Sequence, residues 1–124
     1  MGRVLIVDDS RAVRTLLART MRELGYEVSE AANGKEALDS IEASAEPLEL
    51  VLLDWNMPEM DGLELLKILR AHPRHGSVAV IMVTSETEMT QVARALEAGA
   101  TEYVMKPFTA DVVAGKLRLA GLLA

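Results

Sequence analysis

Short runs of consecutive apolar residues alternate along the chain with longer segments in which apolar and polar residues recur at helical spacing. Runs of Val, Ile and Leu without polar interruption are typical of strands that are buried on both faces of a parallel sheet. The segments between them are long enough to be the helices that connect parallel strands. The sequence therefore predicts five strands alternating with five helices. The strands are expected at residues 4–7, 26–31, 50–53, 78–83 and 103–105.

The helices are expected between these strands and after the last one, where Thr109 is a suitable N-cap. Gly25 and Gly99 are placed to end the first and fourth helices, and Pro47 separates the second helix from the third strand. The predicted helices cover residues 10–24, 33 onward, 63–71, 87–98 and 109 to the end of the chain.

Three of these helices have a predicted buried face, because their apolar residues recur about every 100° around the helix axis. In the second helix the expected buried residues are Ala37, Leu38 and Ile41. In the first helix the arginines at positions 11, 14, 19 and 22 fall on the opposite, solvent-exposed arc. Its expected buried residues are Val13, Leu16, Leu17, Met21 and Leu24. In the fourth helix the expected buried residues are Met89, Val92, Ala93 and Leu96.

Length and charge narrow the class of protein further. A chain of 124 residues has room for one compact domain with a proper core, so we expect a single domain over residues 1–124 and no effector domain. A net charge of −6 argues against binding to nucleic acid through its phosphates. No apolar run approaches the roughly 20 residues that span a bilayer, and the chain enters its first strand without a secretory signal. We expect a cytoplasmic monomer that contacts no membrane.

Polar side chains occur at the carboxyl ends of four predicted strands, which is where open α/β sheets bind ligands. Asp8 and Asp9 end the first strand, Asp54 ends the third, Thr84 follows the fourth and Lys106 follows the fifth. If the first and third strands are neighbours, three carboxylates converge at one edge of the sheet. Such a group requires a counter-charge, and its oxygen atoms suit a divalent cation such as Mg²⁺.

Each of these residues also has an ordinary interpretation when it is considered alone. Asp8 and Asp9 could be the solvated start of a helix, and Lys106 could be a surface lysine. Their combined presence at strand ends favours a site for phosphoryl transfer. There an aspartate acts as the nucleophile, and a lysine and a threonine bind the phosphoryl oxygens. Asp54 is the candidate nucleophile, because it is the carboxylate that stands alone on its strand.

At these separations Asp8-Asp9, Asp54, Thr84 and Lys106-Pro107 resemble the receiver domain of two-component response regulators. The segments Asp-Trp-Asn-Met-Pro-Glu-Met-Asp-Gly at 54–62 and Lys-Pro-Phe-Thr at 106–109 resemble its single-domain chemotaxis members in particular. The resemblance covers nearly the whole chain. It implies an α/β, flavodoxin-like (βα)₅ fold, doubly wound around a parallel sheet with strand order 2-1-3-4-5.

The resemblance also implies a role for each matching position. Asp54 would accept a phosphoryl group from a histidine kinase, and Thr84 and Lys106 would bind its oxygens. The implied Mg²⁺ ligands are the carboxylates of Asp9 and Asp54 and the backbone carbonyl of Asn56, with Asp8 acting through water. Tyr103 would be an aromatic switch, Asn56 and Glu86 would tune dephosphorylation, and the Lys106–Pro107 peptide bond would be cis.

Several functions remain open within and beyond this family. The output partner could be a flagellar motor switch or another protein, or the chain could relay its phosphate to a histidine phosphotransfer protein. A phosphatase of the haloacid dehalogenase type would need a second aspartate where this chain has Asn56, and a flavin carrier would need a phosphate loop where it has Asp8-Asp9. We therefore expect a signalling protein rather than an enzyme with a separate substrate.

Overall fold

The computed structural model of the chain describes residues 2–44, 47–55, 57, 60–85 and 91–123. Five parallel strands form one sheet in the order β2-β1-β3-β4-β5, which confirms the fold expected from the sequence. Along the chain the elements are β1 (Arg3–Val7), α1 (Arg11–Glu23), β2 (Glu27–Ala31), α2 (Gly34–Ala43), β3 (Leu50–Asp54), α3 (Gly62–Ala71), β4 (Ala79–Thr84), α4 (Val92–Glu97), β5 (Glu102–Met105) and α5 (Ala110–Leu119).

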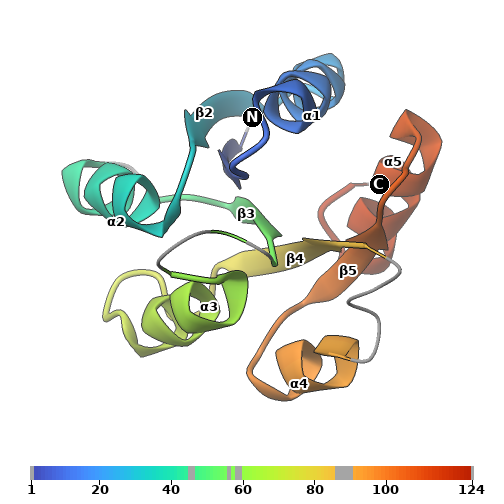
Figure 1. The fold of residues 1–124 in the computed structure, drawn as a ribbon. Coiled ribbons are helices and arrows are strands. Elements are labelled where there is room, and N and C mark those ends of the chain that lie inside the picture. Colours follow the sequence, from blue (N-terminus) through green and yellow to red (C-terminus); the bar gives the residue numbers. More distant parts are fainter. Residues whose placement is uncertain (1, 45–46, 56, 58–59, 86–90, 124) are drawn as a thin grey trace.

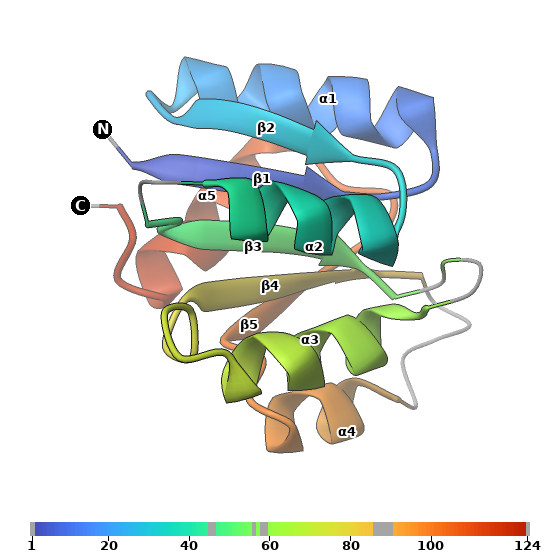
Figure 2. The ribbon, with the colours of Figure 1, turned by 90° about the vertical axis from the view of Figure 1, so that its left-hand side faces the viewer.

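Helices cover both faces of the sheet. Figure 1 shows α1 and α5 on one face and α2, α3 and α4 on the other. The two faces form separate apolar cores, because successive side chains along a strand point to opposite sides. Residues 4–7 of β1 and all of β3 are buried, as expected for central strands that contact helices on both sides. The carboxyl ends of the strands point to a common edge of the sheet, on the right in Figure 2.

Local sequence sets most of the helix ends. The side chains of Ser10, Asn33, Asp61 and Thr109 each accept a hydrogen bond from a backbone N–H in the first turn of α1, α2, α3 and α5. Gly25, which follows α1, has a positive φ of 96°, a conformation that costs glycine little. None of the helices in the described ranges is long and apolar enough to cross a membrane.

The predicted buried face of α1 is partly wrong. Leu16 is 47% exposed, whereas Thr20 is buried. Thr20 can face the core because its hydroxyl donates to the carbonyl of Leu16 at 3.0 Å, which satisfies the polar group inside the protein. Arg14 also departs from the expected exposed arc, because its guanidinium turns toward the end of β1 and donates to the Asp8 carbonyl at 2.6 Å.

The predictions for the last two helices also need correction. In α4 the buried residue is Ala95, while Ala93 and Leu96 are exposed and Met89 lies outside the described residues. Ala95 packs against the core, whereas Leu96 is 43% exposed and only borders the pocket beneath the helix. The α5 helix ends at Leu119 rather than continuing to the end of the chain, and Gly121 follows it with a positive φ of 78°.

Arg70 joins two connections at the amino end of the sheet, a role that no pattern in the sequence predicts. Its Nε and Nη2 donate to the carbonyl of Gly99 at 2.9 and 2.7 Å, and its Nη1 donates to the carbonyl of Val78 at 2.6 Å. A further contact from Nη1 reaches the Gly76 carbonyl at 3.3 Å. The planar guanidinium therefore holds the start of β4 and the connection between α4 and β5 to the end of α3.

We expect Arg70→Leu to lower the free energy of unfolding by about 2–3 kcal/mol, because it leaves backbone carbonyls that were paired to a charged donor without a partner. Arg70→Lys should recover little of this loss, since an ammonium group cannot match the fork of the guanidinium. Urea denaturation measures both variants. The control is Arg22→Leu, at an exposed arginine on α1, which should change stability little. Equal losses of stability at positions 70 and 22 would contradict this structural role of Arg70.

Candidate functional site

Three carboxylates meet at the carboxyl edge of the sheet. Asp8 and Asp9 follow β1, Asp54 ends β3, and these two strands are hydrogen-bonded neighbours. One oxygen from each of the three side chains lies within 4.8 Å of the others. Asp8 and Asp54 are buried, whereas Asp9 is exposed. The structure therefore brings together the three acidic residues that the sequence placed at neighbouring strand ends.

Backbone and side-chain hydrogen bonds fix the position of Asp8. Its carboxylate oxygen Oδ1 accepts from the backbone N–H of Ser10 at 2.8 Å, and its own N–H donates to the carbonyl of Ala31 on β2 at 3.1 Å. The Arg14 guanidinium holds the Asp8 carbonyl and lies 3.4 Å from Glu30 Oε1. The other carboxylate oxygen, Oδ2, is buried and accepts no hydrogen bond from the described residues. Its charged neighbour is the Lys106 ammonium group at 3.4 Å, and it can still accept a hydrogen bond or bind a cation.

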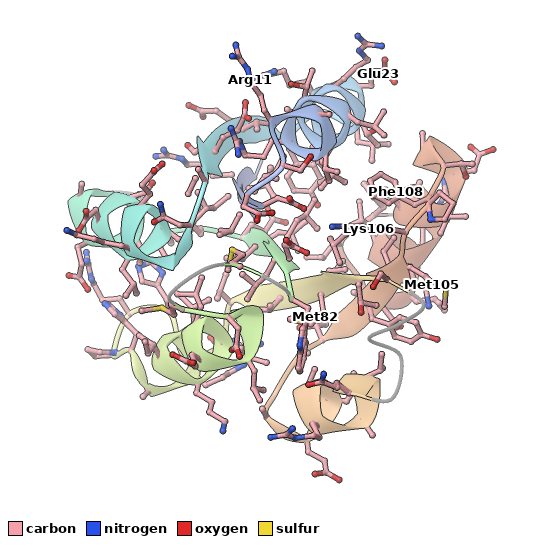
Figure 3. All side chains as sticks on the ribbon, viewed as in Figure 1. Arg11, Glu23, Met82, Met105, Lys106 and Phe108 are labelled. Carbon is pink, nitrogen blue, oxygen red and sulfur yellow. The ribbon has the colours of Figure 1, made fainter. Side chains whose placement is uncertain are left out.

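Lys106 brings a positive charge to this group from the end of β5. Its Nζ donates to Asp54 Oδ1 at 3.1 Å and lies 3.4 Å from Asp8 Oδ2. Figure 3 shows Lys106 extending from the connection between β5 and α5 toward the centre of the sheet edge. The Lys106–Pro107 peptide bond is cis, and the Lys106 N–H donates to the carbonyl of Thr84, which ties the connection to the end of β4.

The charges in the site do not balance, since one ammonium group faces three carboxylates. Burial and the charge of Asp8 together raise the pKa of Asp54 from 3.8 to about 6, although Lys106 opposes this rise. Burial disfavours the charged form of Lys106, but the hydrogen bond and charge of Asp54 outweigh it and raise the pKa of that lysine. Lys106 is thus protonated and Asp54 is mostly ionised at neutral pH. An added cation would relieve the remaining repulsion.

Thr84 and Tyr103 lie beside this group on the face of the sheet that α4 covers. Thr84 ends β4 and is buried, with its hydroxyl donating a long contact of 3.4 Å to the Ser85 carbonyl. Tyr103 on β5 pairs with Met82, two residues before Thr84, so both side chains point to the same face. They line a common apolar pocket with Trp55 and Ala95. The labelled Met82 marks this region in Figure 3.

Two further side chains surround Tyr103, and sequence reasoning assigned them no role. Lys116 on α5 places its Nζ 4.3 Å from the centroid of the Tyr103 ring and 3.4 Å from Glu102 Oε1. The same Glu102 oxygen accepts from the Tyr103 N–H at 3.0 Å. No motif links a strand residue to a lysine on the next helix, so only the packing of α5 on the sheet could show this contact. Two predicted tuning residues, Asn56 and Glu86, lie outside the described residues.

Asp54→Asn should raise the free energy of unfolding at about pH 8 in magnesium-free buffer, because one of two carboxylates sharing Lys106 is removed. The raised pKa of Asp54 means that the wild type loses stability as pH rises from 3.8 through about 6, whereas the variant has no such group. We expect a gain of about 1–3 kcal/mol that shrinks toward about pH 4. Urea denaturation across this range measures it.

The control for this variant is Asp39→Asn, which removes an exposed carboxylate on α2 and should not reproduce the pH-dependent gain. If Asp54→Asn is instead less stable than the wild type at alkaline pH, the prediction is wrong. In that case the attraction of Lys106 stabilises the ionised Asp54 more than burial and the charge of Asp8 destabilise it.

Comparisons with known proteins give the same picture as the geometry. Residues 4–118 match the family model of the response regulator receiver domain. The chain is 42% identical over 118 residues to the chemotaxis protein CheY1 of Helicobacter pylori, with 94% of each chain covered. It is also 42% identical over 116 residues to the CheY homolog of Campylobacter jejuni, covering 93% of this chain and 88% of that protein.

The same similarity holds for solved structures. The chemotaxis protein CheY4 of Vibrio cholerae aligns with a TM-score of 0.88 and 32% sequence identity, covering 97% of this chain and 98% of that one. Because these matches span nearly the whole chain, they favour a receiver over the phosphatase and flavin-carrier classes that the sequence left open. The chain belongs to the response regulator receiver domain family.

Proposed function

We propose that this protein is a phosphorylation-controlled signalling switch in which Asp54 accepts a phosphoryl group from a phosphohistidine of a kinase. The observation that carries the proposal is the hydrogen bond of 3.1 Å from Lys106 to the buried Asp54, with the buried carboxylate of Asp8 3.4 Å from the same ammonium group. This arrangement holds a carboxylate oxygen ready to attack and keeps a cation where negative charge would collect on a phosphoryl group. An ion pair that only contributed to the surface of the protein would not require its carboxylates to be buried.

The donor set fits Mg²⁺. Asp8, Asp9 and Asp54 offer only oxygen atoms, which this hard cation prefers, and the buried Asp8 Oδ2 lacks a hydrogen bond from the described residues. We assign Asp9, Asp54 and the backbone carbonyl of Asn56 as ligands, with Asp8 acting through water. When bound, the ion would supply positive charge for the phosphoryl oxygens and offset the excess of carboxylates.

In the proposed reaction an Asp54 oxygen forms a bond to phosphorus while the bond from phosphorus to the donor imidazole nitrogen breaks. The product is an acyl phosphate, and the imidazole leaves with the electron pair of the broken bond. Lys106 would donate to one phosphoryl oxygen and Thr84 to another. Movement of the Thr84 hydroxyl toward the phosphoryl group would leave space that the Tyr103 ring can fill, since both residues line the pocket under α4. That change biases a pre-existing two-state equilibrium.

The relatives named above are chemotaxis proteins, and we propose that this chain likewise acts in chemotaxis, in the cytoplasm, as a receiver domain. It would receive phosphate from a histidine kinase and bind an output protein such as a flagellar motor switch, with no separate substrate. The alternative within the family is a relay that passes phosphate on to a histidine phosphotransfer protein. Transfer of ³²P from the labelled chain to such a protein would favour the relay.

We expect acetyl phosphate with Mg²⁺ to add one phosphoryl group to the protein, measured by intact mass, and Asp54→Asn to abolish the addition. The acyl phosphate should be released by hydroxylamine, because that reagent attacks the carbonyl carbon. Asp111→Asn, at an exposed carboxylate of α5, is the control and should label like the wild type. A hydroxylamine-resistant label that persists on Asp54→Asn would overturn the proposed mechanism.

We also expect Mg²⁺ to change the fluorescence of Trp55, which is buried and directly follows Asp54. The change should saturate in the millimolar range, since hydrated Mg²⁺ gives up its water reluctantly and few protein ligands replace that water. Asp9→Asn should weaken the response, whereas the exposed Asp39→Asn should not. An unchanged titration of Asp9→Asn would remove this residue from the proposed ligand set.

A further inference from the structure

Lys116 holds the Tyr103 ring from the opposite face of the sheet. Tyr103 points toward the face that α4 covers, whereas α5 lies on the other face. Because β5 is the edge strand, the lysine can reach around it, and its Nζ lies 4.3 Å from the ring centroid. Glu102 completes the group, since one of its oxygens contacts both the Lys116 ammonium and the Tyr103 N–H. The ring is thus held at the edge strand by a cation that is itself held by a carboxylate.

Movement of the ring would break this contact. The pocket that Tyr103 shares with Thr84, Trp55 and Ala95 lies under α4, so a ring that fills it moves away from α5. A cation is attracted to the face of an aromatic ring only when it lies near the centroid. The Lys116 contact therefore stabilises the structure with the ring at the edge and is lost when the ring turns inward.

We propose that Lys116 is a positioning residue that opposes the inward movement of Tyr103 and thereby lowers the affinity of the Asp54 site for a phosphoryl group. This role rests on the proposed function. It adds to that function a residue that sets the population of the inward Tyr103 ring before phosphorylation. Thermodynamic linkage makes the effect reciprocal. A contact that holds the ring at the edge strand lowers the affinity of any ligand whose binding favours the inward ring.

The side chains are buried enough for the contact to matter. The Lys116 and Glu102 side chains are 25% and 22% exposed, so water screens their charges less than at an open surface. Glu102 keeps the ammonium oriented over the ring instead of extended into solvent. A cation–π contact at such a site shifts an equilibrium by about 2- to 5-fold, which is the change expected on removing it.

The test compares Lys116→Met, which keeps the length of the side chain but removes its charge, with Lys116→Arg, which keeps the charge. The matched control is Arg118→Met, since Arg118 is an exposed cation on the same helix. Each protein is titrated with beryllofluoride at saturating Mg²⁺, and Trp55 fluorescence reports binding. The rotamer populations of Tyr103 are measured separately from three-bond NMR couplings without beryllofluoride.

Lys116→Met should bind beryllofluoride about 2- to 5-fold more tightly than the wild type and should increase the population of the inward Tyr103 rotamer. Lys116→Arg and Arg118→Met should behave like the wild type. In a Tyr103→Leu background, Lys116→Met should have no effect on binding, because the ring that the cation contacts is gone. That result separates action through Tyr103 from a general effect of charge.

Two results would overturn the proposal in different ways. If Lys116→Met binds beryllofluoride like the wild type and leaves the Tyr103 rotamers unchanged, the lysine does not position the ring, although the phosphoacceptor assignment survives. If the wild type itself binds no beryllofluoride, the proposed function fails, and the role of Lys116 fails with it.

Discussion

One ammonium group shared between two buried carboxylates is the interaction on which the site depends. Lys106 lies 3.1 Å from Asp54 and 3.4 Å from Asp8, and both carboxylates are almost completely removed from solvent. Burying charged groups without a partner is costly, so Lys106 offsets part of the cost of placing two carboxylates at this position. A single lysine still leaves an excess of negative charge once Asp9 is included. This excess of negative charge makes the site suited to a cation.

The sheet makes this arrangement possible. Parallel strands buried on both faces leave their polar groups only at the ends, and the order β2-β1-β3-β4-β5 places β1 and β3 side by side at the centre. Asp8 and Asp54 come from these two strands, while Lys106 arrives from the edge strand β5. The Lys106 side chain therefore has to reach past the end of β4 to meet the carboxylates. The contact of the Lys106 N–H with the Thr84 carbonyl ties that crossing to the sheet.

The two ends of the sheet are held in different ways. At the amino end, the Arg70 guanidinium fixes the connection before β5 through short hydrogen bonds to the Gly99 carbonyl. At the carboxyl end, the one contact of the Thr84 hydroxyl with the described residues is a long one, and the Tyr103 ring is contacted from α5 by Lys116. Weak, partly exposed contacts can be exchanged at small cost, whereas the Arg70 hydrogen bonds cannot.

Much of the fold follows from sequence because its signals are local. Apolar runs predict buried strands, and Ser10, Asn33 and Thr109 cap helices at positions that the residue types favour. The acidic site was also predictable, since residues at the carboxyl ends of parallel strands must share one edge of the sheet. The resemblance to receiver domains added the strand order, and thereby the adjacency of Asp8 and Asp54.

Other features were decided by tertiary packing. The rotation of α1 about its own axis exposes Leu16 and buries Thr20, whose hydroxyl can enter the core because it is hydrogen-bonded to the preceding turn. Lys116 meets Tyr103 only because α5 packs beside an edge strand. Hydrophobic spacing reports which side of a helix is apolar, but the angle and distance at which helices pack depend on every side chain in the interface at once. The sequence by itself determined the elements and the chemistry at the strand ends, and tertiary packing decided which side chains control that chemistry.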